Sequence, residues 1–355
     1  MNEKMKAVAV TDLKKTEIIE VDKPQDLFPD ELLIKVEAVS LCTVEQRNFL
    51  GIVDWGKPFI GGHEYAGEVV ACGDYVGHFR VGDHVVGNGI FCGMCDYCHS
   101  GNSTQCQLDD DDAHSCRPAF DMEGGSIVGG ACAQYMRLPA HKAFKLDPSL
   151  PYEKAALVEP ISCCLHGVNK LNIKFGDTVV IIGCGIMGIA QVQLCKLRGA
   201  RVIVSELDAE RRKKALRNGA QIAINPAECD PVEEVKRLTK GLGAAAVINT
   251  TPIAAVWDQA IGMLAPKGKL LAYSSQHPDK PYGISFGKMH SKEYEFIGTV
   301  NAGVEDFVQA IRLVEFGLVN VDELTSGIYK LEDCQKAFED ASLPSTYRCV
   351  IKLHE

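Results

Sequence analysis

The segment TVVIIGCGIMG, residues 178–188, decides the fold of one half of the chain. Its first five residues are mostly β-branched and apolar, which is typical of a buried parallel strand. The pattern G-x-G-x-x-G follows, in which the first glycine permits a tight turn, the second lets the backbone approach a pyrophosphate, and the third lets helix and strand pack closely. We interpret the segment as a dinucleotide-binding turn. Its candidate cofactor-binding residues are Gly183, Gly185, Ile186, Met187 and Gly188.

Strand and helix patterns alternate beyond that turn, up to about residue 300. Such alternation predicts a doubly wound parallel sheet, and we expect this domain to span residues 159–299. Two more helices and a last strand then return to the first domain. The expected strands are 178–182, 201–205, 222–224, 246–249, 269–273, 295–298 and 348–353. The expected helices are 188–198, 209–218, 231–240, 255–264, 305–316 and 331–341.

An acidic residue about 20 positions after the glycine turn is the expected partner of the cofactor ribose. Glu206 stands there, and its carboxylate would accept hydrogen bonds from the ribose hydroxyls and repel a 2′-phosphate, which favours NAD over NADP. Asp208 is the alternative acid. Arg211 is interpreted as a contact to the adenine face, although a nearby arginine can also accommodate a 2′-phosphate. Thr250, directly after the expected strand 246–249, is a further candidate contact.

The first half of the chain has short strand patterns separated by Gly-rich turns. We expect a β-rich domain of residues 1–158, completed by 300–355, and a helix at 152–170 where the character of the sequence changes. Four consecutive acids at 109–112 are interpreted as a solvated loop. The expected strands of this half are 6–10, 31–39, 67–72, 84–86 and 133–138.

Composition limits the classes of function. The chain has 355 residues, enough for two domains, and its 46% hydrophobic content is ordinary for a globular protein. A net charge of −10 without a Lys/Arg cluster argues against nucleic acid or membrane partners and favours a small-molecule substrate. The start of the chain is polar, and no apolar run reaches the ~18 residues of a bilayer span. We therefore expect a cytoplasmic protein whose 15 cysteines are metal ligands or buried thiols.

Four of these cysteines have the spacing C-x2-C-x2-C-x7-C: Cys92, Cys95, Cys98 and Cys106. Four thiolates close a tetrahedron around zinc without an open position, which predicts a structural zinc site in a lobe of about residues 90–116. An iron–sulfur cluster is the rival, but the similar run of bacterial ferredoxins has a shorter fourth spacing that is followed by Pro. Metal-free thiols are the third interpretation.

A second group of possible metal ligands is spread along the chain. Cys42 follows a predicted strand, His63 and Glu64 lie in a Gly-rich turn, and Glu159 lies near the domain boundary. A thiolate, an imidazole and a carboxylate can bind one zinc ion and leave a position open for substrate. Spacing alone does not establish this site, because a single histidine in a turn is more often a surface residue.

These motifs, in this order, resemble the zinc-dependent medium-chain dehydrogenases over residues 5–353. GHEYAGEV at 62–69 resembles the family's zinc motif GHE-x-x-G, and VGDHV at 81–85 resembles its GD-x-V turn. Within the family the chain looks most similar to the polyol branch, which includes sorbitol, threonine and galactitol-phosphate dehydrogenases. Glu159-Pro160 is similar to that branch's signature, as are FGK at 286–288 and KE at 292–293.

The resemblance implies a β-rich GroES-like catalytic domain and a Rossmann NAD-binding domain. It implies two zinc ions per chain and hydride transfer between a secondary alcohol of a small polyol-like substrate and NAD. It implies that Cys42 and His63 are catalytic zinc ligands, that Glu64 and Glu159 compete for the remaining protein position, and that Arg348 lies near the cofactor pyrophosphate. Since relatives self-associate, it also implies a homodimer or homotetramer.

One departure from the family concerns the residues after the zinc cysteine. The family has a hydroxyl residue two positions later, which starts a proton relay, and then Asp; here Val44 and Glu45 stand there. Val44 cannot relay a proton, so Thr43, Glu64 or water is the alternative. Glu45 is expected to replace Asp as the partner that orients His63.

Several alternatives stay open at this point. The substrate is expected to be a polyol, with threonine-type and phosphorylated-polyol specificities as alternatives. A catalytically silent NAD(H)-binding sensor and a zinc-independent reductase are rivals of other kinds. The candidate substrate-pocket residues, by position only, are Phe49, Trp55, Phe59, Phe120 and the segment around Asn301.

Overall fold

The computed structural model describes residues 3–89, 91–107, 120, 122–276 and 281–355, and in it the chain divides into two units. Unit 1 comprises Met1–Ser162, Ala302–Gly317 and Leu324–Glu355, and unit 2 comprises Cys163–Asn301 and Leu318–Glu323. The acidic run at 109–112 lies outside the described residues. None of the described helices is both long and apolar enough to cross a membrane.

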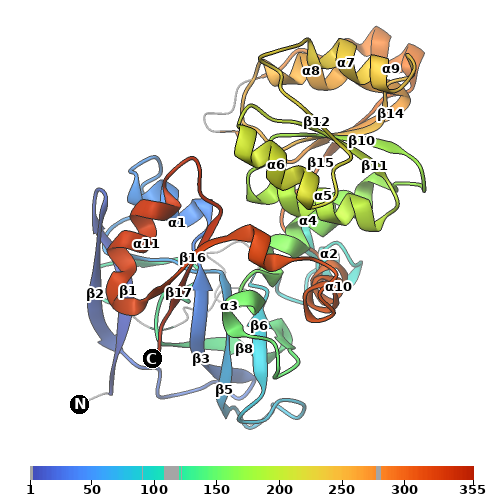
Figure 1. Ribbon diagram of the computed structural model, residues 1–355. Coiled ribbons are helices and arrows are strands. Elements are labelled where there is room, and N and C mark those ends of the chain that lie inside the picture. The colour runs from blue at the N-terminus through green and yellow to red at the C-terminus, as the bar shows by residue number, and fades with distance from the viewer. Residues whose placement is uncertain (1–2, 90, 108–119, 121, 277–280) are drawn as a thin grey trace. The chain divides into compact units, whose positions relative to one another are not determined.

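Unit 2 contains a sheet of six strands in which all neighbouring strands are parallel. The strands are β10 (Thr178–Ile182), β11 (Arg201–Ser205), β12 (Ile222–Ile224), β13 (Ala244–Asn249), β14 (Leu264–Ala272) and β15 (Glu295–Gly298). The helices are α5 (Ile186–Leu197), α6 (Ala209–Arg217), α7 (Pro231–Leu238), α8 (Val256–Gly262) and α9 (Phe286–Lys292), while α4 (Val158–Leu171) begins in unit 1. The strand order β12-β11-β10-β13-β14-β15 makes the sheet doubly wound. Figure 1 shows α5 and α6 on one face of the sheet and α7 and α8 on the other.

The apolar run that begins at Thr178 forms the centre of this sheet. Val180 of β10, Ile203 of β11 and Val247 of β13 are each fully buried, as expected of strands covered by helices on both faces. Gly183 follows β10 with φ of +87°, a left-handed conformation that side chains with a Cβ rarely adopt. The chain therefore turns from β10 into α5 at the place that the glycine pattern predicts.

Unit 1 is built from two sheets. The four-stranded sheet has the order β2-β1-β4-β7, and the seven-stranded sheet has the order β16-β17-β3-β5-β6-β9 with β8 paired to β3. The strands are β1 (Lys4–Asp12), β2 (Lys15–Asp22), β3 (Glu31–Ser40), β4 (Phe59–Ile60), β5 (Glu64–Cys72), β6 (His84–Gly87), β7 (Ser126–Ile127), β8 (Tyr135–Pro139), β9 (Ala143–Lys145), β16 (Thr325–Lys330) and β17 (Arg348–Lys352). The α-helices are α1 (Thr43–Phe49), α2 (Asp96–His99), α3 (Tyr152–Ala155), α10 (Val304–Glu315) and α11 (Cys334–Ala341). Short 3-10 turns are η1 (Ser103–Gln105), η2 (Ala140–Lys142), η3 (Val321–Leu324), whose residues divide between the units, and η4 (Leu331–Asp333).

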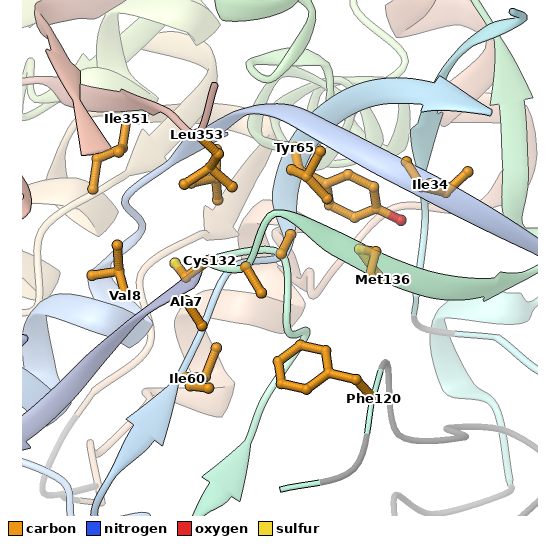
Figure 2. Close-up of a cluster of buried hydrophobic side chains, with 14 of the residues drawn as sticks. Ala7, Val8, Ile34, Ile60, Tyr65, Phe120, Cys132, Met136, Ile351 and Leu353 are labelled. Atoms are coloured by element: carbon orange, nitrogen blue, oxygen red, sulfur yellow. The ribbon is translucent and has the colours of Figure 1, made fainter. Parts of the chain in front are cut away.

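The core of unit 1 joins the two sheets. Val8 of β1, Ile60 of β4 and Ile351 of β17 belong to one cluster of buried side chains, which Figure 2 shows together with Tyr65 and Met136. Because β17 comes from the end of the chain, the last residues complete the core of the first domain. The return of the tail that the sequence predicts is thus present in the fold.

Some elements differ from those that the sequence predicts. The expected helix at 152–170 is two helices, α3 and α4, separated at Ala156 and Leu157. The expected helix at 331–341 begins with the 3-10 turn η4. Strand β2 and the short helices α1 and α9 were not expected. Strand β2 lacks a clear alternation of buried and exposed side chains, and α1, with seven residues, is too short to show a helical period.

Two further expectations are corrected by the packing. Phe49, Phe59 and Phe120 are each no more than 2% exposed and belong to the core, so they are not side chains of an open substrate pocket. Residues 318–323 lie with unit 2, although the sequence placed all of 300–355 in the first domain. Gln193 of α5 holds this segment through two hydrogen bonds with the backbone of Asn320, at 2.6 and 3.2 Å, and Lys214 of α6 lies 3.7 Å from the carboxylate of Glu323.

Replacement of Gly188 by alanine tests the packing of helix α5 against the glycine turn. A Cβ at this position would lie 2.1 Å from the Gly183 carbonyl oxygen, so the helix must shift. We expect Gly188→Ala to lower the free energy of unfolding of unit 2 by about 1–3 kcal/mol, measured by urea denaturation. The control is Gly185→Ala, because a Cβ at this position would meet no atom within 4 Å. This variant should lower the free energy of unfolding by less than about 1 kcal/mol. Equal losses in the two variants would contradict this packing.

Candidate functional site

Cys42, His63 and Glu64 come together at one end of the seven-stranded sheet. Their possible metal-binding atoms all lie within 4.8 Å of one another. Strand β3 ends two residues before Cys42, and β5 begins directly after His63. Since β3 and β5 are antiparallel neighbours with Ser40 opposite Glu64, the end of one strand lies beside the start of the other. The strand register therefore brings together residues that are separated in the sequence.

The buried carboxylate of Glu45 holds these two segments in place. One of its oxygens accepts a hydrogen bond from the Cys42 N–H at 2.9 Å, and the other accepts one from the Gly62 N–H at 2.9 Å. The second oxygen also lies 3.4 Å from Nδ1 of His63. Burial opposes ionisation of Glu45, but the charge and hydrogen bond of His63 outweigh it and lower the pKa of the carboxyl group. Glu45 thus lies beside Nδ1 of His63, and its expected role in orienting the imidazole stays a prediction.

Two glycines before His63 make room for this arrangement. Gly62 has φ of +102°, and a Cβ there would lie 2.5 Å from the backbone nitrogen of Cys132. A Cβ at Gly61 would lie 2.7 Å from Cγ of Glu45. The turn can therefore lie against both the Glu45 side chain and the Cys132 backbone only because neither residue has a side chain.

Glu64 faces a buried arginine from the last strand. Arg348 donates from Nε to one carboxylate oxygen at 2.8 Å and from Nη2 to the other at 2.5 Å, and Nη2 also lies 3.3 Å from the Cys42 sulfur. Ser40 donates its hydroxyl to Glu64 at 2.6 Å. Burial disfavours the charge on Arg348, but the charges of Glu64 and Cys42 raise the pKa of the guanidinium. The expected contact of Arg348 with a cofactor pyrophosphate stays a prediction.

The remaining residues predicted for this site have different surroundings. Glu159 is half-buried at the start of α4, and its charge acts on Arg348, but it is not among the three residues whose donor atoms meet within 4.8 Å. Thr43 is exposed, with its hydroxyl oxygen 3.7 Å from the Cys42 sulfur. The choice between Glu64 and Glu159 as metal ligand, and the identity of a proton relay, therefore stay predictions.

Two residues of this site were missed by sequence reasoning or assigned another role. Ser40 carries no motif signal, and Arg348 was assigned to the cofactor. The ion pair of Arg348 with Glu64 joins strands β17 and β5, which are separated by almost the whole of the described chain. Only the sheet order, with β17 and β5 on either side of β3, could have revealed it.

The four cysteines of the lobe meet in one cluster. Cys92 and Cys98 have sulfurs 3.8 Å apart, and Cys95 and Cys106 have sulfurs 3.9 Å apart. Zinc–sulfur bonds of about 2.3 Å in a tetrahedron require a sulfur separation of about 3.8 Å, so the cluster has the size of a four-cysteine zinc site. Backbone N–H groups of Met94 and Cys95 both point at the Cys92 sulfur at 3.3 Å, which favours its thiolate form. The donor set thus fits one closed zinc site.

Unit 2 contains a cavity of about 430 Å³ around the glycine turn. All five candidate residues of the turn line it, together with Glu206, Arg211 and Thr250. One Glu206 oxygen accepts the Cys184 N–H at 2.6 Å and the other accepts the Asp208 N–H at 2.9 Å. Asp208 itself caps α6 by accepting the Arg211 N–H, so Glu206 rather than Asp208 presents its carboxylate to the cavity. The cavity fits the negatively charged, ribose-containing ligand that the turn predicts.

Comparisons with known proteins agree with this geometry. Residues 28–148 match the alcohol dehydrogenase GroES-like domain, and residues 187–315 match the zinc-binding dehydrogenase domain. The sorbitol dehydrogenase of Bacillus subtilis (strain 168) is 32% identical and aligns with 95% of this chain and 93% of its own length. The erythritol/L-threitol dehydrogenase of Mycolicibacterium smegmatis is also 32% identical, over 95% of this chain and 94% of its own.

A solved structure has the same fold as this chain. A protein of Sinorhizobium meliloti 1021, described as a zinc-binding dehydrogenase bound to NADP, superposes with a TM-score of 0.86. It is 27% identical, and the match covers 99% of this chain and 100% of that one. Because that protein was solved with NADP, a preference of this chain for NAD or NADP has to be argued from its own residues.

The metal content of the purified protein tests the two clusters separately. We expect two zinc ions per chain by mass spectrometry of the metal, because each cluster has the ligands for one ion. Cys106→Ser should remove one ion and Cys42→Ala the other, and the double variant should retain neither. A single zinc in the unaltered protein, or the loss of the same ion in both variants, would contradict the assignment.

Proposed function

The chain belongs to the zinc-dependent medium-chain alcohol and polyol dehydrogenase family, and from this we propose that it transfers a hydride between a secondary alcohol of a small polyol and NAD. The observation that carries the proposal is that the possible metal-binding atoms of Cys42, His63 and Glu64 lie within 4.8 Å of one another. The carboxylate of Glu45 supports this cluster by accepting the N–H groups of Cys42 and Gly62. The named functions of the two 32% identical relatives, which act on sorbitol and on erythritol or L-threitol, support a polyol as substrate. The cytoplasmic location and the homodimer or homotetramer stay predictions.

Cys42 and His63 would hold the catalytic zinc, with a carboxylate from Glu64 or Glu159 as the third protein ligand. When bound, zinc acts as a Lewis acid on the substrate oxygen, and NAD supplies the hydride acceptor. Glu45 keeps the His63 ring in one orientation, because its carboxylate faces Nδ1 and leaves Nε2 for the metal. Arg348 compensates the charge of Glu64 and lies against the Cys42 sulfur.

The glycine turn would receive the pyrophosphate, and Glu206 would receive the ribose. Both oxygens of Glu206 are held by backbone N–H groups, so its negative charge is fixed beside the cavity. A 2′-phosphate placed there would meet this charge, and of the two arginines nearby Arg212 donates to the carbonyl groups of Glu206 and Leu207 while Arg211 lines the cavity. This arrangement supports NAD as the cofactor.

The first test is NAD⁺ reduction by the purified protein against polyols, polyol phosphates, threonine and simple alcohols. We expect activity on a polyol that disappears when a chelator removes the catalytic zinc and returns when zinc is added. Cys42→Ala should abolish turnover and keep NADH binding, measured by fluorescence titration. Turnover by Cys42→Ala would overturn the zinc assignment. Absence of activity with every substrate, in a protein that binds NADH and two zinc ions, would favour the silent sensor.

The second test compares the two dinucleotides. We expect kcat/KM for NAD⁺ to exceed that for NADP⁺ by at least about tenfold, the effect of ~1.4 kcal/mol from one unfavourable charge contact. Glu206→Gln removes the negative charge and keeps the shape of the side chain, so it should lower the ratio of kcat/KM for NAD⁺ to kcat/KM for NADP⁺. A wild-type preference for NADP⁺ would overturn this assignment of the cofactor and make Arg211, which also lines the cavity, the first candidate for binding a 2′-phosphate.

A further inference from the structure

The hydroxyl of Thr250 lies against the glycine turn from the neighbouring strand. Thr250 comes directly after β13, which pairs in parallel with β10. Its Oγ1 lies 2.8 Å from the carbonyl oxygen of Ile182 and 3.1 Å from that of Gly183. A threonine hydroxyl has one proton to donate, so the two oxygens share it. The side chain of Thr250 thus joins the end of β13 to the last residue of β10 and to the first glycine of the turn.

The two carbonyl oxygens differ in their other contacts. The Ile182 oxygen also accepts the backbone N–H of Thr250 at 3.1 Å, so it keeps this partner if the hydroxyl is lost. The Gly183 oxygen lies against helix α5, because a Cβ on Gly188 would be only 2.1 Å from it. The same Cβ would lie 3.7 Å from Oγ1 of Thr250. The hydroxyl therefore contacts the turn at the point where α5 rests on it.

The peptide unit between Gly183 and Cys184 is held from both sides. Its carbonyl oxygen faces the hydroxyl of Thr250, and its N–H donates to Oε2 of Glu206 at 2.6 Å. Because a peptide unit is planar and trans, its C=O and N–H point in nearly opposite directions. The two contacts come from β13 and β11, the strands on either side of β10. Rotation of this peptide away from one partner also moves it away from the other.

The carboxylate of Glu206 depends on this peptide for one of its two backbone contacts. Its other oxygen accepts the Asp208 N–H at 2.9 Å, from the segment that follows β11. Only the contact through Oε2 ties the carboxylate to the glycine turn. Thr250 and Glu206 both line the cavity, so the peptide between them connects two parts of its wall.

We propose that Thr250 is a positioning residue for the dinucleotide. Its hydroxyl fixes the Gly183–Cys184 peptide, and this peptide fixes the carboxylate of Glu206 beside the cavity. The inference rests on the proposed function, in which the glycine turn receives the pyrophosphate and Glu206 receives the ribose. Loss of the hydroxyl should therefore reduce both the affinity for a dinucleotide and the preference for NADH over NADPH.

The test is calorimetric titration of the purified protein with NADH, NADPH and ADP-ribose. We expect Thr250→Val to raise the Kd for NADH and for ADP-ribose about three- to tenfold, the effect of one lost hydrogen bond. The ratio of the Kd for NADPH to the Kd for NADH should fall, because the charge of Glu206 is less firmly placed. Thr250→Ser keeps the hydroxyl and should retain most of the affinity.

A double-mutant cycle tests whether Thr250 acts through Glu206. If both hold the same peptide, Thr250→Val should weaken NADH binding less in a Glu206→Gln background than in the wild type. The loss in the double variant is then smaller than the product of the two single losses. Losses that multiply would show that the two residues act independently, and would overturn the proposal.

Thr239→Val is the matched control in unit 2. The Thr239 hydroxyl also faces two carbonyl oxygens, those of Val235 at 2.8 Å and Lys236 at 3.2 Å, at the end of α7. It accepts the Gly243 N–H at 2.8 Å as well, and Thr239 does not line the cavity. This variant should lower the thermal stability of unit 2 and leave the Kd for NADH unchanged, which separates a loss of affinity from a loss of stability.

Three results would overturn the role of Thr250: wild-type affinity in Thr250→Val, equal losses in Thr250→Ser and Thr250→Val, or an equal loss in Thr239→Val. The titrations need no turnover. A wild-type chain that binds NADH but oxidises no alcohol would therefore overturn the proposed function alone. A wild-type chain that binds neither dinucleotide would overturn both.

Discussion

The buried carboxylate of Glu45 is the interaction on which the candidate site depends. It accepts the N–H of Cys42, where α1 begins, and the N–H of Gly62, in the turn before β5. Because one side chain holds both segments, neither metal-binding residue can move without breaking a charge-assisted bond in an interior that water does not reach. Glu45, which lies beside Nδ1 of His63, therefore helps to set the geometry of the predicted ligands.

Two acids of the same kind have opposite surroundings only a few ångströms from the same cysteine. Glu45 faces an imidazole, which can be neutral or charged, whereas Glu64 faces a guanidinium, which in a protein stays charged. The charge of Glu64 is thus compensated inside the fold, and that of Glu45 is available to polarise His63. A buried carboxylate at the position of Glu64 without such a partner would leave an uncompensated charge inside unit 1, which is strongly destabilising.

The sequence predicted what is local and failed where contacts join distant strands. The lobe of four cysteines, the glycine turn and four strands of unit 2 (178–182, 201–205, 222–224 and 295–298) could be located because a short spacing or a β-branched run specifies each. The ion pair between Arg348 and Glu64 could not, because it depends on the order β17-β3-β5. Phe49, Phe59 and Phe120 were misjudged for the same reason: whether an aromatic side chain is in a core or a pocket depends on which sheet covers it.

The two metal-binding clusters therefore differ in how much of the fold they require. The cysteine lobe takes its ligands from one short segment, so its geometry depends on its own turns and on the metal. The cluster at Cys42 needs β3, β5 and β17 in register, and β17 comes from the last residues of the chain, after all of unit 2. Without β17, Glu64 would keep the hydrogen bond from Ser40 of β3 but would have no cation as partner. The catalytic cluster is thus completed only when unit 1 closes, and this couples its chemistry to the folding of the whole chain.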